Sequence, residues 1–221
     1  VAELGVGMAP DRIMLAFASN CALALANAWI ARRFLTGPPW FGTLRNVITY
    51  IALCVGVVPA LVAAAGAMVP AGATTNLAQY WLYWSNWFLG NALAGLTLSP
   101  VLLTWLMPDR RHRTSNTVWR QVEALLFVAA FVVACFISLQ VSAGMTHSVL
   151  APGVLYLPLP VILWGAMRFG EKGGSGAILV LTILSIWQAM RAPVLFADGD
   201  PGQAVLGLQL FLIGIAIPTL L

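Results

Sequence analysis

Apolar runs of about 20 residues recur along the whole 221-residue chain, separated by short charged or Gly/Pro-rich joints. A run of that length crosses the hydrocarbon core of a bilayer as an α-helix. The seven acidic and eleven basic side chains are too few to cover a soluble globule of this size. The pattern therefore predicts an all-α, polytopic transmembrane helical bundle with no extramembrane domain.

We predict about seven membrane-spanning segments. The third is longer than one straight span, and the aromatic residues of its Gln79–Trp84 stretch suit a headgroup belt. The fifth is short and has Pro158 and Pro160 in its first turn, so we expect an oblique path or shielding by neighbouring helices. The predicted segments are Arg12–Phe34, Leu44–Val69, Leu77–Met107, Trp119–Val141, Leu155–Phe169, Gly174–Phe196 and Gln203–Leu221.

Positive charge is concentrated in alternate joints. If the seven segments alternate in direction, nine of the eleven cations lie on one side of the membrane, which the positive-inside rule makes cytoplasmic. The prediction puts Val1 outside and Leu221 at the cytoplasmic face. The nine cations are Arg32, Arg33, Arg45, Arg110, Arg111, Arg113, Arg120, Arg168 and Lys172.

The chain opens on Val1 without an initiator Met or the pattern of a signal peptide, and it ends on Leu221 without a polar cap. We expect residues 1–221 to form a single integral membrane domain that is a fragment of a longer protein.

No motif for catalysis, metal binding or nucleic-acid binding occurs in the chain. The three cysteines lie inside apolar runs, where thiols behave as small hydrophobes, and the two histidines lie in predicted loops. The basic residues cluster in short loops and form no basic face with interleaved aromatics. The sequence predicts a chain that is not an enzyme, needs no cofactor or metal, and has the lipid bilayer as its surroundings.

Amides inside apolar segments are the first candidate functional groups. Asn20 and Asn27 are seven residues apart, hence on one helix face, and an amide in hydrocarbon needs a partner. They are either interhelical hydrogen-bonding groups or ligand contacts. Asn86 and Gly90 are four residues apart and Asn91 follows Gly90, so this region beside Trp87 is either a packing surface or part of a polar pocket.

Three further sites complete the candidates. Gln188 and Arg191 share a face close to acidic residues of the following loop, as a solute site or as an anchored loop. Gln209 is a buried amide of the last span, with a role in packing or in signalling. At the cytoplasmic end, Arg168 either snorkels or pairs with Glu123, which Arg120 can also reach at i−3, as an interfacial ion pair.

Four strings, read in order, carry a family resemblance. They are Asn20–Asn27 ending at Arg32-Arg33, Trp84–Gly95 running to Ser99-Pro100 and Trp105, Leu157–Pro160 running through Trp164 to Arg168-Phe169-Gly170, and Leu208-Gln209-Leu210-Phe211. Together they resemble the bacterial membrane-associated sensor domain, first type (MASE-one). The resemblance implies a helical sensory region of the bacterial inner membrane that feeds a cytoplasmic histidine kinase, diguanylate cyclase or PAS-containing output.

The chain departs from the family pattern in three places. The first spans of the family, with their Trp-Pro-Pro-like motif, are absent, Asn91 stands where the family has an acid, and the stretch Met190–Phe196 differs from the usual Gly-x-Gly-Pro-Phe. These differences bear on any charge-dependent role of Asn91 and on an outer ligand loop.

The leading hypothesis is a membrane sensory domain that responds to an unknown small ligand or to a membrane partner. An accessory or structural subunit that packs against a larger membrane complex is the alternative. The expected protein partners are other membrane proteins or a second copy of the chain. A transporter is disfavoured because only Glu123 offers a carboxylate near membrane depth. The ligand or signalling candidates are Asn20, Asn27, Trp87, Asn91, Gln188, Arg191 and Gln209.

Overall fold

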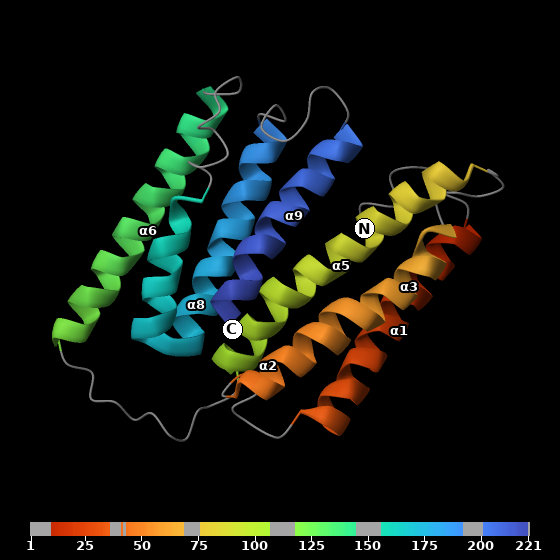
Figure 1. Ribbon diagram of the computed structural model, residues 1–221, viewed down its shortest axis with the longest axis horizontal. Coiled ribbons are helices and arrows are strands. Elements are labelled where there is room, and N and C mark those ends of the chain that lie inside the picture. The colour runs from red at the N-terminus through yellow and green to blue at the C-terminus, as the bar shows by residue number, and fades with distance from the viewer. Residues whose placement is uncertain are drawn as a thin grey trace.

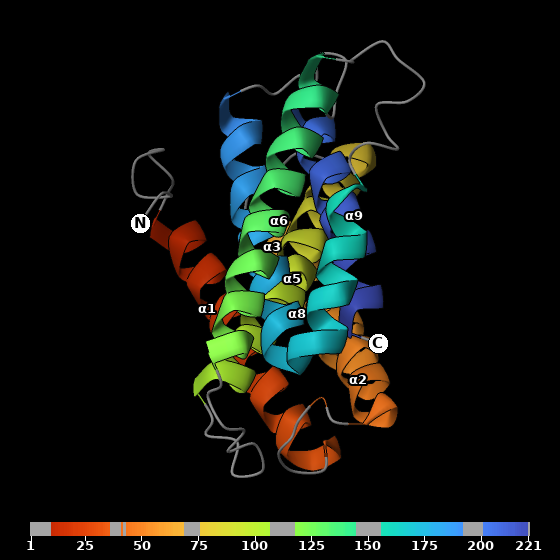
Figure 2. The same ribbon diagram turned by 90° about the vertical axis from the view of Figure 1, so that its left-hand side faces the viewer.

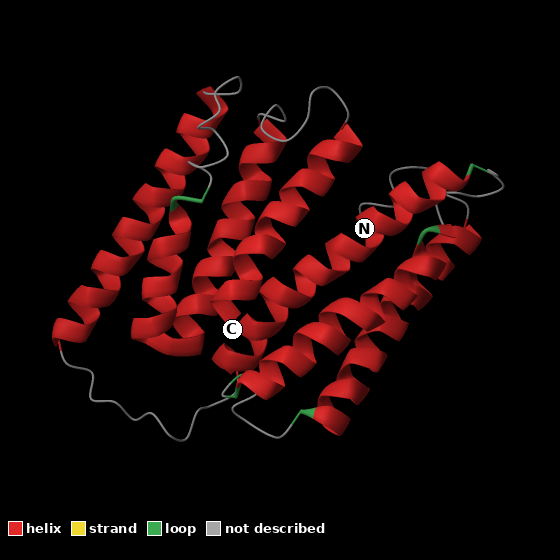
Figure 3. Ribbon diagram, in the orientation of Figure 1, coloured by secondary structure: helices red, strands yellow, loops and turns green. Residues whose placement is uncertain are grey.

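The computed structural model describes residues 10–35, 41, 43–68, 76–106, 118–144, 156–191 and 201–220. Every regular element in this part of the chain is a helix, and it contains no strand (Figure 3). The predicted all-α fold is confirmed. Five helices are long and apolar enough to cross a membrane, and Val205–Leu220 is a shorter apolar helix.

The first half of the chain forms two antiparallel rods. The first rod is α1 (Pro10–Phe34), which begins on a proline because the first helical position needs no N–H partner. The second rod is continuous and comprises α2 (Leu44–Tyr50), the π-helix η2 (Ile51–Val57) and α3 (Val58–Gly66). Its start is capped by Thr43, whose hydroxyl oxygen accepts from the backbone N–H of Asn46 at 3.3 Å.

A π-helical turn in the second rod accommodates Pro59. The proline has no N–H, and its ring crowds the carbonyl of the preceding turn. In η2 the backbone N–H of Val58 instead donates to Leu53 O, five residues earlier, which is the wider spacing of a π-helix. The rod therefore passes the proline without a break.

The second half of the chain contains α5 (Leu77–Leu106), α6 (Val118–Gly144), α8 (Pro158–Arg191) and α9 (Pro201–Leu220). Within α8, Gly170 has φ 66° and ψ −156°, which separates two helical arms. The chain reverses direction there (Figure 1). The predicted joint between the fifth and sixth segments is thus reduced to a reversal at Gly170, and Glu171 and Lys172 already belong to a helix.

Glycines allow the two arms of α8 to approach closely. A Cβ on Gly173 would lie 2.6 Å from Gly165 O, and one on Gly174 would lie 3.1 Å from the Cβ of Ala166. Where the short first arm begins, Pro158 is less than 2% exposed, whereas Tyr156 and Leu157 before it are 47% and 43% exposed. Next to it the Tyr156 ring packs edge-on against Phe211 of α9, at 5.4 Å between centroids.

Helix α5 is the centre of the bundle. It packs against α3 and η2 on one side and against α8 and α9 on the other, while α1 contacts α3 and α6 contacts α8. Figure 2 looks onto α6, with the first arm of α8 beside it. Fully buried aliphatic side chains of α5, α8 and α9 meet in the middle; these include Leu96, Ile178, Leu181, Leu212 and Ile215.

Hydrogen bonds from aromatic side chains connect α5 to the second rod. Trp84 Nε1 donates to Ala60 O at 3.1 Å, and the Tyr80 hydroxyl donates to Ala64 O at 3.2 Å. In the opposite direction, the Tyr50 hydroxyl donates to Gly95 O at 2.6 Å. Aromatic residues predicted for a headgroup belt therefore also join two helices.

Consecutive rods alternate in direction. The end of α1, the start of α2, the end of α5, the start of α6 and the reversal in α8 all lie at the lower end of the bundle in Figure 1. The end of α9 is there too, since the Thr219 methyl lies 3.5 Å from a Cβ placed on Gly174.

Replacing Gly170 with alanine should destabilise the protein, because its φ and ψ are essentially restricted to glycine. We expect a loss of about 1–3 kcal/mol, seen as a lower unfolding midpoint in detergent. The matched control is Gly214→Ala in α9, where a Cβ meets nothing within 4 Å and the midpoint should not fall. Equal midpoints for the two variants would contradict the assigned reversal.

Candidate pocket between helices α1, α5 and α9

One face of α5 carries a stripe of polar and aromatic residues. Tyr83, Trp87 and Asn91 are four residues apart, and Asn86 and Gly90 fall beside them, so all five project from neighbouring positions on the helix. The stripe lies in the first half of α5, about 9 to 21 Å along the axis from its start at ~1.5 Å per residue.

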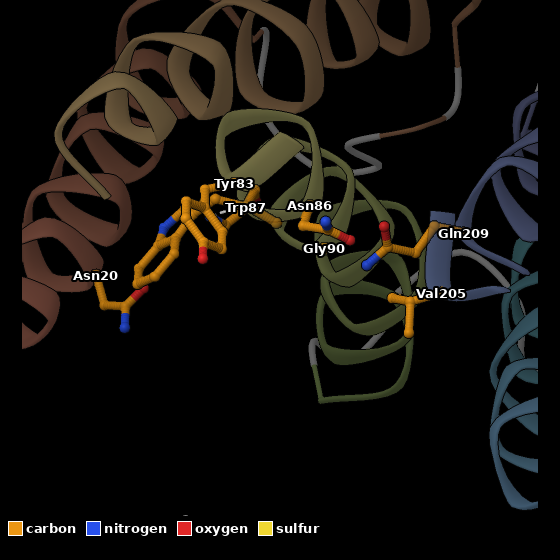
Figure 4. Close-up of a pocket in the computed structure, with 8 residues that line it drawn as sticks. Asn20, Tyr83, Asn86, Trp87, Gly90, Val205 and Gln209 are labelled. Carbon is orange, nitrogen blue, oxygen red and sulfur yellow. Dashed lines mark hydrogen bonds between the residues drawn. The ribbon is translucent and has the colours of Figure 1, made fainter. Parts of the chain in front are cut away.

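Helices α1 and α9 flank the stripe and form with it an open pocket of about 390 Å³. Asn20 comes from α1, and Val205 and Gln209, one turn apart, come from α9. In Figure 4, Asn20 lies near Tyr83 and Trp87, whereas Gln209 faces Asn86 from the opposite side. The lining residues are Asn20, Tyr83, Asn86, Trp87, Gly90, Asn91, Val205 and Gln209.

The two asparagines of α5 are oriented by their own helix. Asn86 Nδ2 donates to Leu82 O and Asn91 Nδ2 donates to Trp87 O, both at 3.0 Å. A carbonyl oxygen accepts only from the amide NH₂ group, so these bonds fix which end of each side-chain amide is nitrogen. The Oδ1 atoms remain as acceptors.

Gln209 is a half-buried amide of the pocket whose carbonyl oxygen is buried. Gly90 makes room for it, since a Cβ there would lie 3.4 Å from Gln209 Nε2. Its Oε1 is buried and has no hydrogen-bond partner in the part of the chain that the structure describes. An unsatisfied buried acceptor costs about 1–3 kcal/mol, which a ligand or water that donates to it offsets.

The indole of Trp87 is held against α3 by a glycine. A Cβ on Gly66 would lie 2.5 Å from the Trp87 ring, so only glycine permits this contact. Trp87 therefore connects the pocket to the second rod.

Four of the predicted residues meet in this pocket: Asn20, Trp87, Asn91 and Gln209. Asn27 lies outside its lining, about two turns before the end of α1, with its Oδ1 buried and unpartnered among the described residues. Gln188 is half-buried on α8 and also lies outside the lining. The side chain of Arg191 and the loop aspartates predicted beside it fall outside the described residues.

Sequence reasoning missed Tyr83 and Val205; it weighed Asn86 and Gly90 as packing residues or pocket lining but did not include them in the candidate set. Helical spacing offers a signal for each of them: Tyr83 lies one turn before Trp87, Asn86 and Gly90 immediately precede Trp87 and Asn91, and Val205 lies one turn before Gln209. Spacing along the chain could not show that α1 and α9 both lie beside this face of α5.

A bidentate ion pair connects α6 to the first arm of α8. Arg168 Nε donates to Glu123 Oε1, and Arg168 Nη2 donates to Glu123 Oε2 at 2.7 Å. The side chains are 56% and 27% exposed, respectively. Arg120 lies one turn before Glu123 and adds its positive charge to the carboxylate's surroundings. The two planar groups meet as a fork, which fixes the angle between them better than a point charge does.

Aromatic packing lies next to this ion pair. Phe127 of α6 fits against Gly165, where a Cβ would lie 2.3 Å from the Phe127 ring. It also contacts the rings of Trp164 and Phe169 at centroid distances of 5.7 and 5.3 Å. The start of α6, which carries Glu123, is thus held against α8 by both the ion pair and the aromatic packing.

A model of the MASE1 family matches residues 8–221. The chain belongs to the MASE1 family. The resemblance carried by the four strings is therefore confirmed. MASE1 is a membrane-associated sensor domain and not a catalytic one, so this chain is a multi-pass membrane protein of sensory type, with its helices in a lipid bilayer.

Searches of curated proteins and of solved structures gave no significant match to this MASE1 domain.

Replacing Gly66 with alanine should displace Trp87 and destabilise the MASE1 domain by about 1–3 kcal/mol through overpacking. Denaturant unfolding in detergent measures the change. Gly56→Ala in the same rod is the control, because its Cβ would meet only Ile51 O at 3.5 Å. A Gly66→Ala variant as stable as Gly56→Ala would show that Trp87 does not pack against Gly66.

Proposed function

We propose that this chain is a single sensory domain of the bacterial inner membrane, in which occupancy of the α1–α5–α9 pocket controls a cytoplasmic output such as a histidine kinase or a diguanylate cyclase. The output would follow α9 in the longer protein. The domain itself supplies recognition and movement, and no chemical step.

The observation that supports this proposal most is that helices on opposite sides of α5 line one pocket. Helix α1 packs on the second rod, whereas α9 packs on α5 and α8, and Asn20 and Gln209 bring both helices to the same cavity. A ligand that contacts both helices changes the free energy of their relative placement. It therefore shifts the population of two arrangements if it binds them with different affinity.

Seven crossings are the membrane topology that we propose. They are α1, the rod from α2 to α3, α5, α6, the two arms of α8, and α9. Alternating rod directions support this number, and so does the clustering of cations at one end of the bundle, where Arg32 and Arg33 end α1 and Arg45 begins α2. The same rule makes that end, and the end of α9, cytoplasmic.

Reporter fusions test the topology. Green fluorescent protein joined after Arg113 or Leu221 should fluoresce, and alkaline phosphatase joined after Thr75 or Gly199 should be active, because the first pair of sites is proposed to be cytoplasmic and the second external. Active phosphatase after Leu221 would reverse the orientation of the last crossing and contradict a cytoplasmic output.

Gln209→Leu tests signalling through the pocket. Leucine removes the unpartnered Gln209 oxygen and so stabilises the empty pocket. We therefore expect the difference in output activity between stimulated and unstimulated membranes to fall at least twofold. The measurement is product formation by the output domain in the intact protein. Gln121→Leu, an exposed amide on α6, is the matched control and should leave the range unchanged.

Intact mass separates this function from that of an accessory subunit. A mass tens of kilodaltons above 23.6 kDa, with a soluble domain after Leu221, supports the sensor. A mature protein near 23.6 kDa would remove an attached output and favour a subunit of a larger membrane complex.

A further inference from the structure

Both hydrogen-bond donors and acceptors line the pocket. Asn86 and Asn91 each use one N–H on a helix carbonyl, so each keeps a second N–H and its Oδ1 oxygen. Gln209 differs from them because its Oε1 is buried and has no partner among the described residues. That oxygen requires a donor, which a ligand supplies as an O–H or N–H group. A hydroxyl suits the whole lining because it both donates and accepts.

The lining carries no charged side chain in the part of the chain that the structure describes. An ion moved from water to such a site loses hydration and gains no counter-charge, a cost that rises steeply in surroundings of low dielectric constant. The occupant that fits this lining is uncharged.

Aromatic surface and size define the remaining shape. Tyr83 and Trp87 lie together on the side of the pocket nearest Asn20, opposite the Asn86 and Gln209 amides (Figure 4). Such rings stack on the flat face of a sugar or an aromatic ring. The volume of about 390 Å³ lies near the lower end of the range of about 300–1,000 Å³ for small-molecule sites.

We propose that the α1–α5–α9 pocket binds an uncharged ring that carries hydroxyl groups, with the ring against Tyr83 and Trp87 and the hydroxyls donating to Asn91 and Gln209. This assignment rests on the proposed sensory function and names its ligand class. The ring arrives either from the bilayer, as a lipophilic phenol or quinol, or from water, as a sugar.

The test compares probes that differ in one property each. Purified protein in nanodiscs is titrated with 5-pentylresorcinol, its dimethyl ether and methyl β-glucoside, and binding is followed by calorimetry. The ether keeps the ring and tail but has no donors, so it should bind at least tenfold more weakly than the diol. Stronger binding of the resorcinol identifies a bilayer source, and stronger binding of the glucoside identifies an aqueous source.

Variants place the binding in this pocket. Gln209→Leu should weaken binding of the preferred hydroxyl probe about tenfold and reduce the difference between diol and ether, whereas Gln121→Leu should bind like the unaltered protein. The comparison of probes on the unaltered protein needs no variant, so it stands even if Gln209→Leu does not fold.

Several results would overturn the ligand class. The first is equal affinity for the diol and its ether, and the second is no saturable binding of any neutral probe. The third uses two charged probes, a resorcinol that carries a carboxylate and a phenol that carries a trimethylammonium group: tighter binding of either one than of the neutral diol. If the probes fail while Gln209→Leu still narrows the output, the sensory function stands and only the ligand class is wrong. If the diol binds and the output does not change, the ligand class stands and the proposed sensory function is wrong.

Discussion

The bilayer gives the peptide backbone no water to bond with, so each N–H and C=O group inside it must find a partner in the protein. Helices meet this condition for every residue except those near prolines and reversals. The structure handles these exceptions one at a time: a π-helical turn carries the second rod past Pro59, and a single glycine with positive φ reverses α8. In α5 a third feature joins helices: the Thr104 hydroxyl donates to Pro100 O at 2.7 Å and lies 3.2 Å from Ser175 Oγ of α8.

Close approach of helices is the second requirement, because hydrocarbon tails compete with apolar side chains and give little net drive for association. Glycine supplies that approach at Gly66, Gly165 and Gly173, where an added Cβ would meet a ring or a backbone oxygen at 2.3 to 2.6 Å. At each of these glycines a neighbouring residue occupies the space that a side chain would fill. The resulting packing makes small shifts of one helix felt by the next, since tightly packed interiors have few voids to absorb them.

A polar group that the packing leaves without a hydrogen-bond partner does not add to the stability of such a bundle. The Gln209 oxygen has no partner among the described residues, although Asn86 faces it across the pocket. A bundle optimised for stability alone would have leucine there. An unsatisfied acceptor in a MASE1 domain fits a state that is completed by something outside the chain, and it gives that molecule free energy with which to favour one helix arrangement.

The sequence by itself determined the helical class, the family and the approximate helix bounds, because apolar length and local spacing are properties of single segments: Leu44 and Leu77 begin helices as predicted, and the spacing of Trp87 and Asn91 put them on one face. Only the tertiary structure decided which segments are neighbours. Asn20 and Gln209 are 189 positions apart in the chain, and no periodicity relates them; their meeting at α5 depends on how glycines and aromatic donors pack one helix on the next. Asn27 has the same residue type and the same helix face as Asn20 yet lies outside the pocket, since seven residues place it about 10 Å further along α1.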